Sequence, residues 1–252
     1  MRFSANTGFL YRELPFLERI GAAAAAGFDA VEFHDEAQRE DPGALAGALA
    51  AAGLPVLGLN VRMGETAGRA AIPGAEAEAR ADIDAAAAVA GAVGAGAIHV
   101  LSGRAEGDAA RAALVGNLRH ALGRFPGTVL IEPICRAANP GYFLSSLDQT
   151  LAILAEVDHP RLKILFDCYH VETGDGDCLG RFRAALPHLG HVQIASLPDR
   201  AEPTGGRLDY ARLLPAMVGA GYAGAFGCEY RPSEPPAAML ARLRARLAPE
   251  SR

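Results

Sequence analysis

Short apolar runs alternate along the chain with longer segments in which Ala, Leu and Arg recur at helical spacing. This alternation predicts repeated βα units and a parallel sheet. Eight runs have the length and composition of buried strands: Arg2–Asn6, Ala30–Phe33, Val56–Asn60, Ala97–Leu101, Thr128–Glu132, Leu162–Asp167, His191–Ala195 and Ala225–Tyr230. Helical segments between them include Leu14–Ala26, Pro42–Ala52 and Glu76–Val93. Glycines that would end helices stand before four of the strands, at Gly27, Gly53, Gly94 and Gly221.

Eight strands with intervening helices predict an α/β fold, a single (β/α)8 TIM barrel. The length of 252 residues suits one such barrel, so we expect one domain over residues 1–252. An open doubly wound sheet is the alternative, but no GxGxxG motif follows the first strand. The longest irregular stretches are Val61–Gly74, Pro133–Ser145 and Ser196–Leu208. All three follow strands, on the side where barrel active sites form.

Composition and charge restrict the binding partners and the cellular location that we expect. Half of the residues are hydrophobic and the net charge is −5, which gives no reason to expect nucleic acid or an anionic membrane as a partner. We expect no signal peptide and no membrane span, and therefore a cytoplasmic protein that could form a homo-oligomer. The four cysteines form no CxxC pair, so we expect small buried side chains rather than a zinc site.

Each of the last four predicted strands carries an oxygen-bearing side chain: Glu132, Asp167 and Glu229 terminate their strands, and Gln193 lies within the strand His191–Ala195. Three carboxylates at one barrel mouth would repel each other unless a cation lay between them. Carboxylate and amide oxygens suit Mg²⁺ or Mn²⁺, so the pattern predicts a divalent metal site. The alternative is that each acid pairs with an arginine such as Arg136 or Arg200.

The sequences at these strand ends resemble a known family. They read LIEPI, FDCYH, HVQIA and GCEY, in this order. Together with RFSAN at the N-terminus, GFDAVEF at the second strand, IPG at residues 72–74 and PGY at residues 140–142, they are similar to the hydroxypyruvate isomerase family of xylose isomerase-like barrels. The resemblance runs from Arg2 to about Pro232.

The resemblance implies a metal bound by the residues at positions 132, 167, 193 and 229. It implies that Glu132 and Glu229 also act as the acid and base of catalysis. His170, three residues after Asp167, matches a histidine that contacts the substrate or a ligand, and Arg200 matches an arginine that holds the substrate. Asn60 and Glu202 are further candidates for substrate binding.

Three positions depart from the family pattern. Cys135 stands where Asn is usual, Ser196 where Asp is usual, and Arg207 where Glu is usual. The metal set is retained while positions that orient the substrate have changed. The class of chemistry is therefore more firmly indicated than the substrate.

The function implied is the interconversion of a short hydroxy-keto acid and its aldehyde isomer through an enediolate, as in hydroxypyruvate and tartronate semialdehyde. Arg62, Arg136, Arg200 and Arg207 follow strands and favour an anionic substrate. Alternatives are a sugar or sugar-acid epimerase with the same metal and glutamates, and a barrel without catalytic activity. A DNA-repair endonuclease would need a His-rich multi-zinc centre and a basic surface. Most of the seven histidines are expected on helices or early in strands, which argues against such a centre.

Overall fold

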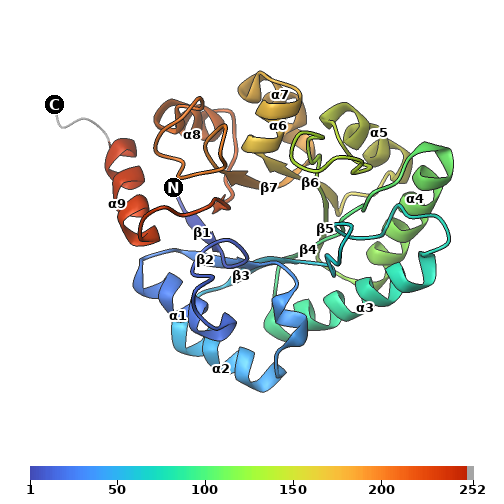
Figure 1. Ribbon diagram of the computed structural model, residues 1–252, viewed down its shortest axis with the longest axis horizontal. Helices are drawn as coiled ribbons and strands as arrows, with labels where there is room; N and C mark the ends of the chain where they lie inside the picture. The colour runs from blue at the N-terminus through green and yellow to red at the C-terminus, as the bar shows by residue number, and fades with distance from the viewer. Residues whose placement is uncertain (249–252) are drawn as a thin grey trace.

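A computed structural model describes residues 1–248, and the predicted barrel fold is confirmed. Eight parallel strands pair in chain order and close into a barrel, with the first strand beside the last (Figure 1). The strands are β1 (Phe3–Asn6), β2 (Ala30–Phe33), β3 (Val56–Asn60), β4 (Ala97–His99), β5 (Thr128–Ile131), β6 (Leu162–Asp167), β7 (Leu189–Ile194) and β8 (Phe226–Cys228). The last four residues of the expected domain, 249–252, lie outside the described part.

Helices surround the strands (Figure 1). They are α1 (Phe16–Ala25), α2 (Pro42–Ala52), α3 (Glu76–Val93), α4 (Gly107–Arg124), α5 (Leu147–Val157), α6 (Cys168–Gly174), α7 (Cys178–Ala185), α8 (Tyr210–Gly219) and α9 (Pro236–Leu247). Gly53 and Gly94 end α2 and α3 in the left-handed conformation, as expected of helix C-caps. Within residues 1–248, the helices are too short or too polar to cross a bilayer.

The predicted strand bounds agree with the structure best at β2, β3 and β6, which match at both ends. Strands β4, β5 and β8 end earlier than expected, because the chain turns into the loops that form the barrel mouth. Glu229 illustrates the difference. It lies beyond the last residue of β8, yet its backbone N–H still bonds to the Ile194 carbonyl at 3.4 Å.

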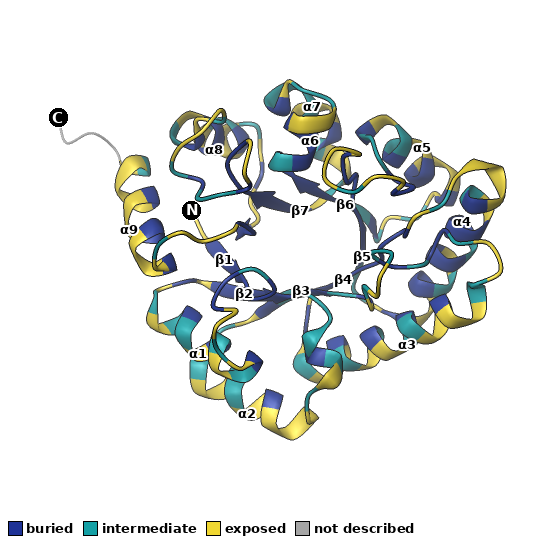
Figure 2. Cartoon of the chain, in the orientation of Figure 1, coloured by how far each residue is buried: buried dark blue, intermediate teal, exposed yellow. Residues whose placement is uncertain are grey.

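The apolar core lies mainly between the strands and the helices, where Figure 2 shows the strands buried and the helices buried on their inner faces. Aromatic pairs join the two layers. Phe166 of β6 meets Phe182 of α7 edge to face at 5.7 Å, and Phe33 of β2 meets Phe16 of α1 at 5.1 Å. The four cysteines are free and buried, as predicted.

A hollow, which we call the lower cavity, enters the barrel from the amino-terminal ends of the strands. It has a volume of about 260 Å³. Exposed glycines border it at Gly96, Gly190 and Gly224, and Glu32 and His191 line it. The small residues leave space that larger side chains fill in many barrels, so the barrel interior is open toward this face.

Candidate active site at the carboxyl ends of the strands

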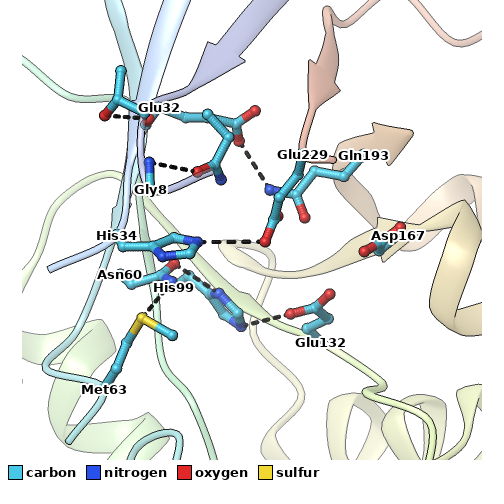
Figure 3. A network of polar contacts seen from close by, with 12 residues as sticks. Gly8, Glu32, His34, Asn60, Met63, His99, Glu132, Asp167, Gln193 and Glu229 are labelled. Atoms are coloured by element: carbon cyan, nitrogen blue, oxygen red, sulfur yellow. Dashed lines mark hydrogen bonds and ion pairs between the residues drawn. The ribbon is translucent and has the colours of Figure 1, made fainter. Parts of the chain in front are cut away.

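Four buried side chains whose oxygen atoms could bind a metal ion meet at the carboxyl end of the barrel (Figure 3). They are Glu132 directly after β5, Asp167 at the end of β6, Gln193 within β7 and Glu229 directly after β8, and we call them the donor set. None is more than 9 % exposed. Three of them line the mouth pocket, a hollow of about 570 Å³ whose lining comprises Phe9, His34, Asn60, Met63, Ala67, His99, Leu101, Arg104, Glu132, Ile134, Ala137, Ala138, Asn139, Tyr169, His170, Gln193, Arg200, Glu229 and Arg231.

The buried guanidinium of Arg200 lies among these groups. Its Nη2 contacts Asp167 Oδ2 at 2.6 Å and Glu229 Oε1 at 3.2 Å. The rings of Phe9 and Tyr169 lie 4.9 and 5.0 Å from the guanidinium carbon. The alternative prediction, that each acid pairs with an arginine, therefore holds for Asp167 and Glu229. It does not hold for Glu132, whose ion-pair partners within the described chain are histidines.

Burial and charge set different protonation tendencies for the three acids. Burial, and then the charges of Asp167 and Glu229, raise the pKa of Glu132 well above its usual range. Burial raises the pKa of Asp167 to about 6, although Arg200 opposes the rise. Burial also acts to raise the pKa of Glu229, but Arg200 and a hydrogen bond with His34 outweigh it and lower that pKa to about 2. One guanidinium therefore does not compensate three converging carboxyl groups.

The residues present fit a divalent cation. Glu132 Oε1 and Gln193 Oε1 are buried without a hydrogen-bond partner among residues 1–248, an arrangement that is costly unless something else binds these oxygens. The set also offers hard oxygen ligands, and one guanidinium, that of Arg200, faces its three carboxyl groups. Such a cation could be held by the whole donor set, as the sequence suggested.

His170 lies close enough to be a further ligand. Its ring is within 4.8 Å of one oxygen each of Glu132 and Asp167. Its Nε2 lies 2.6 Å from Arg200 Nη1. A guanidinium nitrogen can only donate, so Nε2 accepts this hydrogen bond and the ring proton is on Nδ1. Nδ1 faces Cys135 Sγ at 3.4 Å. Burial and the charge of Arg200 hold the pKa of His170 well below its usual value. The imidazole is neutral, the form that a metal ligand requires, and Arg200 would have to release Nε2 before this nitrogen could bind a cation.

Of the residues expected to bind substrate, the structure brings Asn60, His170 and Arg200 to the mouth pocket. Glu202 is not among the residues that line it. Its carboxylate instead accepts bonds from the backbone and side chain of Ser233 and from the backbone of Glu234. Glu202 thus stabilises the loop after β8, and the structure gives it no contact with the mouth pocket.

The expected ring of four arginines is corrected by the structure, because only Arg200 of the four lines the mouth pocket. Arg136 bonds to Ser145, Arg207 pairs with Glu172, and Arg62 borders a separate small hollow. The contacts of Arg136 and Arg207 hold these two side chains outside the mouth pocket. Two other arginines, Arg104 and Arg231, line the pocket in their place.

Two histidines of the pocket were not identified from the sequence. His34 follows β2 and lies 3.4 Å from Glu229 Oε1, and His99 ends β4 and lies 3.7 Å from Glu132 Oε2 (Figure 3). Most of the seven histidines do lie in helices or early in a strand, as expected, and these two are exceptions. Their position at strand ends was the available signal. Burial lowers the pKa of His99 to about 3, so this ring is neutral.

Comparisons with known proteins identify the family of the chain. The family described as xylose isomerase-like TIM barrel matches residues 20–248. The chain is 42 % identical over 245 residues to 2-oxo-tetronate isomerase of Cupriavidus necator, covering 92 % of this chain and 93 % of that one. It is 35 % identical over 246 residues to hydroxypyruvate isomerase of Escherichia coli, covering 92 % and 94 %. The solved structure titled AP endonuclease, family 2, from Brucella melitensis superposes with a TM-score of 0.92 at 35 % identity, covering 97 % and 98 %.

Proposed function

Because the chain belongs to the xylose isomerase-like TIM barrel family, we propose that it is a metal-dependent isomerase of a short hydroxy-keto acid. The reaction interconverts a 2-oxo-3-hydroxy acid and its aldehyde isomer through an enediolate, as between hydroxypyruvate and tartronate semialdehyde. The observation that carries this proposal is the donor set, four buried oxygen-bearing side chains from consecutive strands at one barrel mouth. The names of the relatives point to a three- or four-carbon acid.

A cation bound to the donor set, Mg²⁺ or Mn²⁺ in our proposal, would polarise the carbonyl and hydroxyl oxygens of the substrate. The residues of the chain would transfer the protons and bind the substrate. Glu229, with its lowered pKa, is a carboxylate that can take a proton from a substrate carbon. Glu132 borders the same pocket from β5 and can return a proton to the neighbouring carbon. His170 and Asn60 can bind substrate hydroxyl groups from the pocket wall.

An endonuclease is less consistent with the site, despite the name of one solved relative. In the described part of the chain, one cluster of His, Cys, Asp and Glu side chains is close enough to hold an ion. A multi-zinc centre would need more ligand side chains than this cluster provides. The net charge of −5 also offers little attraction for a nucleic acid backbone.

Proton exchange in D₂O tests the proposal. With Mn²⁺ present, we expect the protein to convert hydroxypyruvate and to introduce deuterium next to its carbonyl group, and EDTA should stop both. Dihydroxyacetone, a neutral ketose with the same number of carbons, should react far more slowly. Faster exchange of the neutral ketose would favour the sugar isomerase or epimerase alternative. Absence of exchange across three- and four-carbon oxo acids and sugars would favour a barrel without catalytic activity.

Arg200→Met tests the charge of the substrate. We expect KM for hydroxypyruvate to rise by about 10- to 100-fold, because charge-assisted hydrogen bonds contribute roughly 1.5–3 kcal/mol. KM for any neutral substrate should change little. Arg136→Met is the matched control, since Arg136 is exposed and lies outside the mouth pocket. An equal rise of KM for acid and neutral substrates would show that Arg200 does not recognise the carboxylate.

A further inference from the structure

A buried glutamate outside the donor set contacts one of its members. Glu32 lies in β2, points into the barrel and is 5 % exposed. Its Oε2 accepts a hydrogen bond from His191 Nε2 at 2.9 Å. It also accepts one from Gln193 Nε2 at 3.1 Å (Figure 3). Its Oε1 accepts a bond from the Ser4 hydroxyl at 3.2 Å. A buried carboxylate is costly unless it is hydrogen-bonded, and the three donors around Glu32 offset that cost and fix its orientation.

We infer that Glu32 is a positioning residue that fixes the side-chain amide of Gln193 with its oxygen toward the metal. This inference rests on the proposed function, since it assumes a cation at the donor set. A carboxamide has one donor end and one acceptor end, whereas an ionised carboxylate can only accept. Glu32 therefore selects the NH₂ end of Gln193 and leaves Oε1 free. That oxygen is buried and has no hydrogen-bond partner among residues 1–248, as expected of an oxygen that would bind a cation.

The surrounding residues are shaped to hold this contact. Gly227 of the GCEY motif passes beside it, and a Cβ there would lie 2.1 Å from Glu32 Oε1 and 2.7 Å from His191 Nε2. Any larger residue would push the carboxylate out of place. Neither strand pairing nor the mouth pocket requires a glycine at position 227. The space that the Glu32 carboxylate needs explains it.

Glu32→Gln is the most direct test, because it keeps the shape and adds a donor. The introduced amide can present its NH₂ group to Gln193 Oε1, so the amide of Gln193 is no longer held in one orientation. We expect Mn²⁺ affinity, measured from the electron paramagnetic resonance signal of free Mn²⁺, to fall about 10- to 100-fold, the usual effect of removing a partner of a metal ligand. Asp29→Asn is the matched control: it removes a carboxylate just before β2 that bonds Phe3 and Arg244 at the protein surface.

A double-mutant cycle distinguishes positioning from a general structural effect. In a Gln193→Ala background, Glu32→Gln should weaken Mn²⁺ binding little further, because the ligand it orients is gone. An equal loss in both backgrounds would overturn the inference, as would an unchanged affinity in Glu32→Gln alone. Either result leaves the proposed function intact if the unmutated protein binds Mn²⁺. A protein that binds no Mn²⁺ would overturn both.

A measurement on the unmutated protein covers the case in which Glu32→Gln does not fold. The side-chain NH₂ resonances of Gln193, assigned by their absence from Gln193→Ala, should exchange slowly with water because Glu32 holds them in the barrel. They should shift on addition of Mg²⁺. Rapid exchange with water, or no shift at a Mg²⁺ concentration that saturates the protein, would overturn the inference.

Discussion

Glu229→Gln is expected to lower kcat by about 10²–10⁴-fold at saturating Mn²⁺, the usual contribution of a general base. Glutamine keeps the oxygen that could bind a cation and loses the ability to accept a proton from carbon. KM should change far less than kcat, because the variant removes an interaction needed only in the transition state. The measurement is steady-state kinetics with hydroxypyruvate, together with deuterium incorporation in D₂O.

Glu132→Gln should show a loss of similar size if the two glutamates divide the proton transfers. Glu36→Gln is the control: this residue lies after β2 and pairs with Arg19, away from the donor set. A Glu229→Gln enzyme with near-normal turnover would place the base elsewhere, and His170 would be the next candidate because it lies in the same pocket.

Asp167→Ala should weaken Mn²⁺ binding by more than about 100-fold, since even the partners of metal ligands contribute about 10- to 100-fold. Asp167 is the most deeply buried acid of the donor set, at 1 % exposed, so water cannot easily replace it. The same residue caps α6 by accepting a bond from the Tyr169 backbone at 2.9 Å. Asp167→Asn should therefore be measured in parallel, because an amide retains much of the cap and loses the charge.

The control for this prediction is Glu36→Ala, which removes a carboxylate that lies outside the donor set. Its Mn²⁺ affinity should equal that of the unmutated protein. Equal affinity in Asp167→Ala and Glu36→Ala, titrated by the resonance of free Mn²⁺, would show that Asp167 is not a metal ligand.

The barrel and its donor set could be predicted because both depend on strand order. In a closed parallel barrel the carboxyl ends of all strands meet at one rim, so a polar residue at the end of an apolar run must lie near the mouth. Glu132, Asp167, Gln193 and Glu229 followed this rule. It requires no knowledge of loops or of side-chain conformations.

The loop arginines could not be placed in the same way. A residue several positions beyond a strand can turn toward the axis or outward, and the loop backbone decides which. Arg200 turns inward from a left-handed backbone conformation with φ of 55°, whereas Arg207, seven residues later, turns to Glu172. No spacing in the sequence distinguishes the two.

Glu32 was missed for another reason. It lies within an apolar strand, where a lone charge usually indicates an exposed position. Its partners Ser4, His191 and Gln193 come from β1 and β7, far apart in sequence. Only closure of the barrel brings these residues together.

The lower cavity and the mouth pocket share three lining residues, Asn60, His99 and Gln193. The two hollows are thus divided by a single layer of side chains, in which His99 Nδ1 bonds to Asn60 Oδ1 at 3.0 Å. For enzyme redesign we expect that the mouth pocket can be deepened along the barrel axis without altering the rim loops. Shortening Asn60, one of the three shared residues, is expected to thin the layer between the hollows. Acceptance of longer oxo acids is therefore best sought by selection at this interior position first.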